Sequence, residues 1–159
     1  MPAHLKNACK YFLSITSQVL WIVSQCNKDK FYIRFICICV MTASTVFSYG
    51  WDITMDWGLM RTLPNGGRTF LRPKILYPSW FYYFAAITNL FLRFLWIITL
   101  FNYSEDLKDS QLIPFLMSLF EILRRAQWAL LRIENENVNN FERYRNILQI
   151  PDFDEDVKK

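Results

Sequence analysis

Three charged residues lie in the middle of an apolar stretch near the C-terminus. The stretch from 112 to 132, LIPFLMSLFEILRRAQWALLR, has the length and composition of a membrane-spanning helix, yet it contains Glu121, Arg124 and Arg125. Their i, i+3 and i+4 spacing places all three on one helical face. Because a central arginine costs about 2.5–3.5 kcal/mol on insertion scales, we expect this face to meet a protein interior or a wet cavity. Guanidinium groups donate paired hydrogen bonds to oxyanions, so the pattern indicates an anion site.

A fourth charge lies deep in another apolar run. Arg93 follows Asn89 by four residues and precedes Trp96 by three. A charge at this depth needs a partner, and the acids near membrane depth are Asp52 and Glu121. Two interpretations stay open, because Arg93 could belong either to a structural ion pair between helices or to the anion site.

The segment WDITMDWG carries two acids one helical turn apart. Asp52 and Asp56 lie between Trp51 and Trp57, which suit a membrane interface, and Gly58 is typical of a helix end. The simpler interpretation is a solvated acidic helix end framed by interfacial aromatic residues. The alternative places Asp52 inside the bundle, opposite the arginines.

The first apolar run begins at Lys10 and Tyr11. Lys10 is either an interfacial lysine that reaches the headgroups or a further cation of the site. In the second case the cations are Lys10, Arg93, Arg124 and Arg125, and the acids are Asp52 and Glu121. Four cations against two acids leave a net charge of +2, which suits an oxyanion such as phosphate. The acids keep binding weak enough for release, since Glu121 could pair with the arginines when the ion leaves.

Four apolar runs must position these side chains. We predict membrane spans at about 10–27, 31–52, 76–103 and 112–133. A composition of 53% hydrophobic and 18% aromatic residues excludes a disordered or collagen-like chain. The sequence therefore predicts an all-α, multi-pass membrane bundle of about four transmembrane helices over 1–145. We expect the polar tail at 146–159 to be disordered.

Other classes of function fit the sequence poorly. The net charge of +4 would suit a nucleic-acid binder, but basic residues inside apolar runs do not. Four cysteines without a CxxC pair and a single histidine predict no metal site. The sequence has no nucleophile–base pair and no glycine-rich phosphate loop, so we expect neither an enzyme nor a cofactor. The polar first ten residues do not resemble a signal peptide.

Charge in the connecting segments favours one orientation. The segment at 61–74 contains Arg61, Arg68, Arg72 and Lys74 and no acid, which is typical of a cytoplasmic loop, whereas the segment at 104–111 is mostly acidic. Basic residues between the first two runs argue for the opposite orientation. On balance we predict that both termini are cytoplasmic, in the plasma membrane or a Golgi or other endomembrane.

Several motifs resemble one known domain. WDITMDWGL, FLRPKILYP, LRFLW and RRAQWALLRIENENVNN occur in that order after an opening HLKNACKY. From about residue 4 to 144 the chain resembles the EXS domain, the C-terminal membrane portion of phosphate exporters of the xenotropic and polytropic retrovirus receptor type, the yeast SYG proteins and plant phosphate-loading proteins. The resemblance implies a phosphate pathway lined by Lys10, Tyr11, Asp52, Arg93, Trp96, Glu121, Arg124 and Arg125.

The chain also departs from the pattern that it resembles. Cys9 replaces a glycine of the family motif, and Ala129 and Asn137 stand where asparagine and histidine are usual. The resemblance implies a domain shortened at its N-terminus by two helices, without the regulatory SPX domain of the full exporters. Phosphate export across a lipid bilayer is the leading interpretation. The alternative is a non-transporting membrane protein or partner subunit with structural ion pairs. Four helices leave an open flank, which a second copy of the chain or a full-length relative could cover.

Overall fold

The chain folds into helices at every long apolar run. The computed structural model describes residues 3–27, 29–60, 67, 69–100 and 111–148. Its helices are α1 (Ala3–Cys26), α2 (Phe31–Trp51), the π-helical turn η1 (Asp52–Asp56), α3 (Ser79–Arg93), the 3-10 helix η2 (Leu95–Leu100) and α5 (Leu112–Leu148). No strand occurs within these described ranges. The all-α prediction is confirmed.

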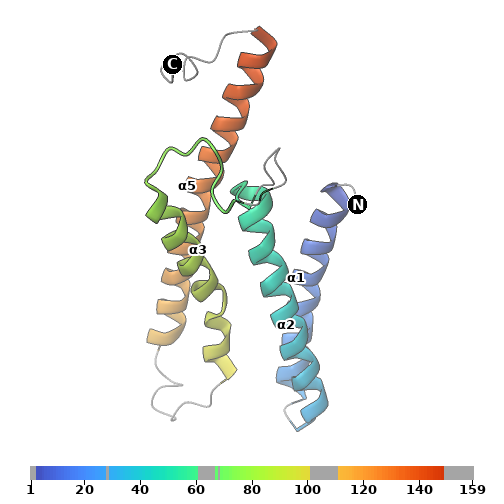
Figure 1. Cartoon of the computed structure of the whole chain (residues 1–159). Coiled ribbons are helices and arrows are strands. Elements are labelled where there is room, and N and C mark those ends of the chain that lie inside the picture. The colour runs from blue at the N-terminus through green and yellow to red at the C-terminus, as the bar shows by residue number, and fades with distance from the viewer. Residues whose placement is uncertain (1–2, 28, 61–66, 68, 101–110, 149–159) are drawn as a thin grey trace.

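The helices form two antiparallel pairs. α1 packs along α2, and α3 packs along α5 (Figure 1). The two pairs meet where α2 and η1 contact α3 and α5. The start of α1, the end of α2 and the start of α3 lie at one end of the bundle, and α5 projects beyond that end (Figure 1). Successive helices therefore alternate in direction, as four membrane crossings require.

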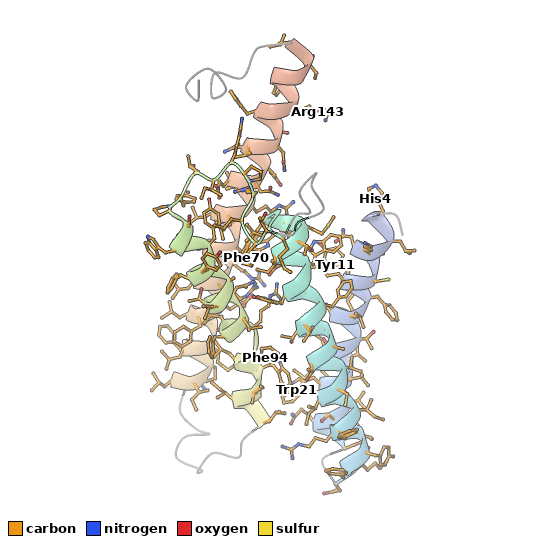
Figure 2. All side chains as sticks on the ribbon, in the orientation of Figure 1. His4, Tyr11, Trp21, Phe70, Phe94 and Arg143 are labelled. Atoms are coloured by element: carbon orange, nitrogen blue, oxygen red, sulfur yellow. The ribbon has the colours of Figure 1, made fainter. Side chains whose placement is uncertain are left out.

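Two helical segments have the length and apolar content to cross a membrane by themselves. They are 31–56, with a mean hydropathy of 1.7, and 79–98, with a mean hydropathy of 1.5. Large apolar side chains on them, such as Phe31, Phe47, Trp80 and Phe91, are exposed, as expected of a surface that faces lipid. Figure 2 shows side chains projecting from the outer faces of the helices. α1 and α5 are long enough to span but are more polar, because they supply many of the charged and amide side chains of the interior.

The helix boundaries differ from the predicted spans. α1 begins at residue 3 rather than 10, and α3 begins at 79, directly after Pro78. Its α-helical part ends at Arg93, where η2 takes over after one residue. α5 runs through residue 148, well past the predicted end of its span at 133. Residues 146–148 of the predicted tail belong to α5. The predicted loop residues at 61–66, 68 and 104–110, residues 101–103 of the third predicted span and the rest of the tail at 149–159 lie outside the described residues.

A small apolar core lies where η1 meets α3 and α5. Ile53, Trp57 and Leu59 pack against Tyr82 and Leu131, and all are buried. η1 ends as the sequence predicts at Gly58, whose φ of 63° is left-handed. The Leu59 amide donates to the Ile53 carbonyl at 2.9 Å, a bond that closes the helix end. This tight end turns Trp57 inward, and the described segment at 69–78 contacts α5 through Arg72.

A buried ion pair fixes that segment. Arg72 Nη2 lies 2.6 Å from Glu134 Oε2, with the two side chains only 3% and 2% exposed. Arg72 Nη1 donates to Asn135 at 2.9 Å, the Leu76 amide donates to Glu134 at 2.8 Å, and the Tyr82 hydroxyl donates to the same carboxylate. Arg72 was counted among the basic loop residues that set the orientation, but its charge is neutralised inside the fold.

Glu134→Ala should destabilise the protein strongly. The substitution leaves Arg72 buried without a counter-charge, and breaking such a pair costs about 3–5 kcal/mol. Glu136→Ala is the matched control, since Glu136 forms an exposed pair with Arg132 on the same helix, worth about 0–1 kcal/mol. Denaturation of the purified protein in detergent measures both. Equal losses of stability in Glu134→Ala and Glu136→Ala would contradict the conclusion that the buried pair of Arg72 and Glu134 stabilises the fold.

Candidate functional site

A cavity opens between the two helix pairs. Its volume is about 440 Å³. Its lining comes from α1, from α3 with the residues that follow it, and from α5: Ser14, Gln18, Leu92, Arg93, Leu95, Trp96, Met117, Glu121, Arg124 and Arg125. Five of the eight residues that the sequence predicted for the site line this one cavity. Lys10, Tyr11 and Asp52 do not line it.

One carboxylate holds the two adjacent arginines. Arg124 donates from Nε to Glu121 Oε2 at 2.8 Å and from Nη2 to Oε1 at 2.7 Å. Arg125 donates from Nε to the same Oε1 at 2.7 Å. The two arginines differ in environment, because the Arg124 side chain is 12% exposed and that of Arg125 is 72% exposed. Arg124 is thus a fixed wall of the cavity, and Arg125 is the more accessible donor.

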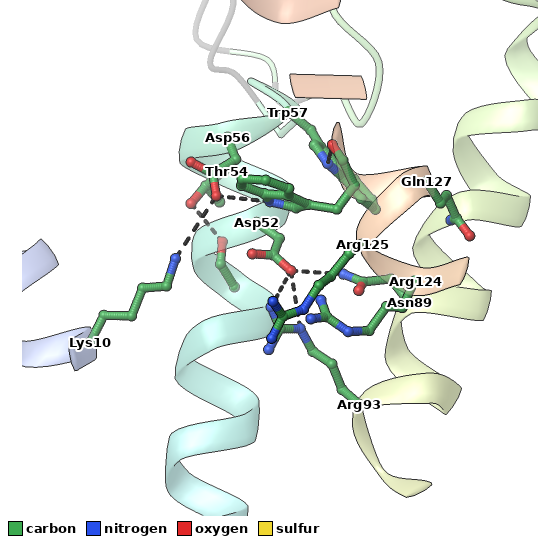
Figure 3. Close-up of polar contacts among 12 residues, drawn as sticks. Lys10, Asp52, Thr54, Asp56, Trp57, Asn89, Arg93, Arg124, Arg125 and Gln127 are labelled. Carbon is green, nitrogen blue, oxygen red and sulfur yellow. Dashed lines mark hydrogen bonds and ion pairs between the residues drawn. The ribbon is translucent and has the colours of Figure 1, made fainter. Parts of the chain in front are cut away.

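Asp52 anchors Arg93 from behind the cavity. The Asp52 carboxylate is 1% exposed, and its Oδ2 accepts hydrogen bonds from Arg93 Nε at 3.0 Å, from Arg93 Nη2 at 2.5 Å and from Asn89 Nδ2 at 3.0 Å (Figure 3). A solvated acidic helix end is therefore wrong for Asp52. The π-helical turn that begins at Asp52 points this carboxylate at α3, so Arg93 reaches the cavity already paired.

Lys10 belongs to a second polar cluster, on α1 near the end where that helix begins. Its Nζ lies 3.9 Å from Asp56 Oδ2, across from α1 to η1 (Figure 3). The ammonium also lies 5.5 Å from the centre of the Trp51 ring. Asp56 accepts a further hydrogen bond from Trp128 Nε1 at 3.0 Å. Tyr11 is exposed beside this cluster (Figure 2).

Three polar residues of this region were missed by the sequence interpretation. Asp56 was noted but not assigned, although it lies one turn after Asp52. Ser14 and Gln18 line the cavity and follow Lys10 at intervals of four residues. That i, i+4 stripe on α1 was the available signal, since such residues share one helical face.

Comparison with known proteins places this arrangement in a family. Residues 1–138 match the model of the EXS family. The chain belongs to the EXS family.

Among curated relatives of this EXS chain, SPX and EXS domain-containing protein 3 of Dictyostelium discoideum is 33% identical over 94% of the chain and 17% of its own length. Phosphate transporter PHO1 of Arabidopsis thaliana is 29% identical over 94% of the chain and 19% of its own length. Its homolog 4 is 31% identical, over 94% of the chain and 20% of its own length. The chain thus spans about a fifth of these relatives. The membrane-domain family and the two apolar segments make it a membrane protein.

The cavity of this EXS domain presents hydrogen-bond donors of the kind that small anions accept from. Three guanidinium groups reach it, and each carries more N–H donors than its carboxylate partner uses. Arg125 uses only Nε to bond Glu121, and its Nη1 and Nη2 donate to none of the described residues. A planar fork of free donors is the geometry that tetrahedral oxyanions bind. Among the described residues, no group of three or more His, Cys, Asp or Glu that could hold a metal ion occurs.

Arg93→Gln should destabilise the protein more than Arg125→Gln. Removing Arg93 leaves Asp52 as an uncompensated buried carboxylate, at a cost of about 3–5 kcal/mol. Removing Arg125 leaves Glu121 paired with Arg124, so a cost of about 0–1 kcal/mol is expected for this exposed partner. Melting curves of the two variants in the same detergent give the comparison. A larger loss for Arg125→Gln would contradict the anchoring role of Asp52.

Proposed function

We propose that this EXS domain contributes a pathway for export of inorganic phosphate across a membrane, through the arginine-lined cavity. The observation that carries the proposal is the convergence of Arg93, Arg124 and Arg125 on one cavity from two helices. Family membership supports phosphate as the ion, since two of the relatives described above are phosphate transporters by name. The role is transport rather than catalysis.

The charge arrangement suits transient binding. Phosphate would take hydrogen bonds from the exposed Arg125 fork and from N–H groups of Arg124 and Arg93 that Glu121 and Asp52 leave unused. Glu121 competes for the same arginines, so the ion replaces an existing ion pair instead of meeting bare positive charge. Conduction requires this balance, because a site that binds too tightly does not release its ion.

The cluster of Lys10 and Asp56 would form a second binding position for phosphate along the pathway. Lys10, Ser14 and Gln18 follow one face of α1 from the cluster at Asp56 to the cavity. A phosphate that moves along this face would pass from an ammonium to neutral hydrogen-bonding groups and then to the arginines. The weak contact of Lys10 with Asp56, at 3.9 Å, leaves the ammonium able to change partner.

Orientation and partners complete the proposal. We propose that both termini are cytoplasmic, in the plasma membrane or an endomembrane. The start of α1, the end of α2 and the start of α3 lie at one end of the bundle, which supports placing the basic segment between α2 and α3 on the side of the N-terminus (Figure 1). One flank of the cavity would be closed by a second copy of the chain or by a longer relative.

A structural role is the second candidate. The buried pairs of Asp52 with Arg93 and of Arg72 with Glu134 join elements far apart in the sequence. Such pairs would hold a bundle together without any transported ion. In that case the chain would be a non-transporting membrane protein or a partner subunit.

The double variant Arg124→Ala, Arg125→Ala tests phosphate export. Expressed in cells that lack their own exporter, the wild-type chain should release labelled phosphate above background, and the double variant should reduce this efflux at least tenfold. The expected size follows from charge-assisted hydrogen bonds worth about 1.5–3 kcal/mol each. Arg132→Ala is the control, because Arg132 lies on the same helix outside the cavity and pairs with Glu136. Absence of efflux from a wild-type chain present at the membrane would favour the structural role.

Glu121→Gln tests the competition between carboxylate and ion. Without its charge, Glu121 no longer competes with phosphate for Arg124 and Arg125. We expect phosphate to bind about tenfold more tightly, equivalent to roughly 1.4 kcal/mol, while efflux slows. Equilibrium binding and efflux are measured together, with Glu136→Gln as the control. Unchanged affinity and unchanged efflux would reject the competition.

A further inference from the structure

Two neutral side chains line the cavity from α1, whereas its arginines come from α3 and α5. Ser14 and Gln18 are one helical turn apart on α1 and line the same cavity as Arg93, Arg124 and Glu121. Within the described part of the chain, neither the Ser14 hydroxyl nor the Gln18 amide has a hydrogen-bond partner. Ser17 differs, because its hydroxyl donates to the Ser14 carbonyl at 2.7 Å.

The hydrogen-bond acceptors of the cavity are unequally occupied. Both oxygens of Glu121 already accept guanidinium N–H groups. The Trp96 indole is only a donor, and it donates to Thr45 at 3.1 Å. Among the described polar groups that line the cavity, the side-chain acceptors without a donor are therefore Ser14 Oγ and Gln18 Oε1.

Free acceptors distinguish protonated from unprotonated oxyanions. Phosphate keeps at least one P–OH group at physiological pH, so it donates one hydrogen bond while its other oxygens accept. Sulfate has no proton and only accepts. Arginines alone bind both ions. Gln18 Oε1 and Ser14 Oγ can accept a hydrogen bond only from phosphate, whereas toward sulfate the same amide and hydroxyl must turn and donate, in a site where guanidinium groups already supply donors. These acceptors therefore add a favourable interaction for phosphate that sulfate does not receive.

The position of Gln18 adds a second observation. Gln18 and Trp96 also line a neighbouring cavity of about 350 Å³, whose other residues include Trp21, Ile22 and Met41. Trp21 lies well along α1 from Tyr11 (Figure 2). Gln18 thus lies where a polar cavity adjoins an apolar one.

We propose that Gln18, assisted by Ser14, accepts the P–OH hydrogen bond and makes the cavity selective for protonated tetrahedral oxyanions. Phosphate and arsenate are then bound in preference to sulfate. The inference rests on the proposed function, because it assigns selectivity to the same anion site. The arginines supply affinity for negative charge. The amide oxygen of Gln18 adds a hydrogen bond only when the bound ion carries a proton to donate.

Competition binding on the purified full chain in lipid nanodiscs tests this assignment. Labelled phosphate is displaced by unlabelled phosphate, arsenate or sulfate. Gln18→Met keeps the side-chain length but removes the amide, and it should lower the ratio of phosphate to sulfate affinity about tenfold, the effect of one lost hydrogen bond in a desolvated site. Ser14→Ala should lower the ratio less. Ser17→Ala is the matched control and should leave it unchanged, since Ser17 does not line the arginine cavity.

A second variant keeps the test decisive if Gln18→Met folds poorly. Gln18→Glu retains an acceptor and adds a charge that repels dianionic sulfate, so it should weaken binding overall while raising the preference for phosphate. An unchanged ratio in Gln18→Met, an equal loss of both ions, or a lower ratio in Gln18→Glu would overturn the selectivity role and leave the phosphate site standing. Failure of the wild-type chain to bind phosphate would instead overturn the proposed function, and the selectivity role with it.

Discussion

The contact between Asp52 and Arg93 holds the two halves of this protein in register. Asp52 ends the first helix pair and Arg93 ends α3, and the hydrogen bonds to one buried oxygen cross between them. Water cannot replace Arg93 at the Asp52 carboxylate, which is 1% exposed, so this buried charge depends on its cation. The pairing also sets the direction of the Arg93 side chain. The cavity, and with it the approach of Arg93 to Arg124, depends on this contact.

The same principle recurs through the described residues, where deep cations are paired with carboxylates. Arg72 pairs with Glu134, and Lys10 lies near Asp56. The pairs differ in burial, and that difference separates structure from function. The Arg72 pair is sealed from solvent and stabilises the fold, whereas Arg125 is largely exposed and retains free donors. A group can exchange one partner for a mobile ion only where exposure lowers the cost of the exchange.

The EXS chain therefore combines a rigid support with a responsive site. The hydrogen bonds and the ion pair at Glu134, together with the apolar core at Trp57, fix the end of the bundle where η1, α3 and α5 meet. The arginine cavity lies farther along α3 and α5, with the polar stripe of α1 on another wall. The arginines of the cavity thus lie on helices whose other end is fixed by buried contacts. Neutral groups at 14 and 18 then line the same cavity as the charged ones, the arrangement on which the proposed selectivity rests.

The sequence by itself determined the helices, the family and the relation among Glu121, Arg124 and Arg125. A repeat of 3.6 residues per turn dictates which side chains share a helical face, so contacts within one helix follow from spacing. Tertiary structure decided every pairing between helices: Arg93 with Asp52 rather than Glu121, Lys10 with Asp56, and the burial of Arg72. It also decided that Ser14 and Gln18 line the cavity. Spacing along the chain carries no information about the rotation and register of one helix against another, because packing and the π-helical turn at Asp52 set both.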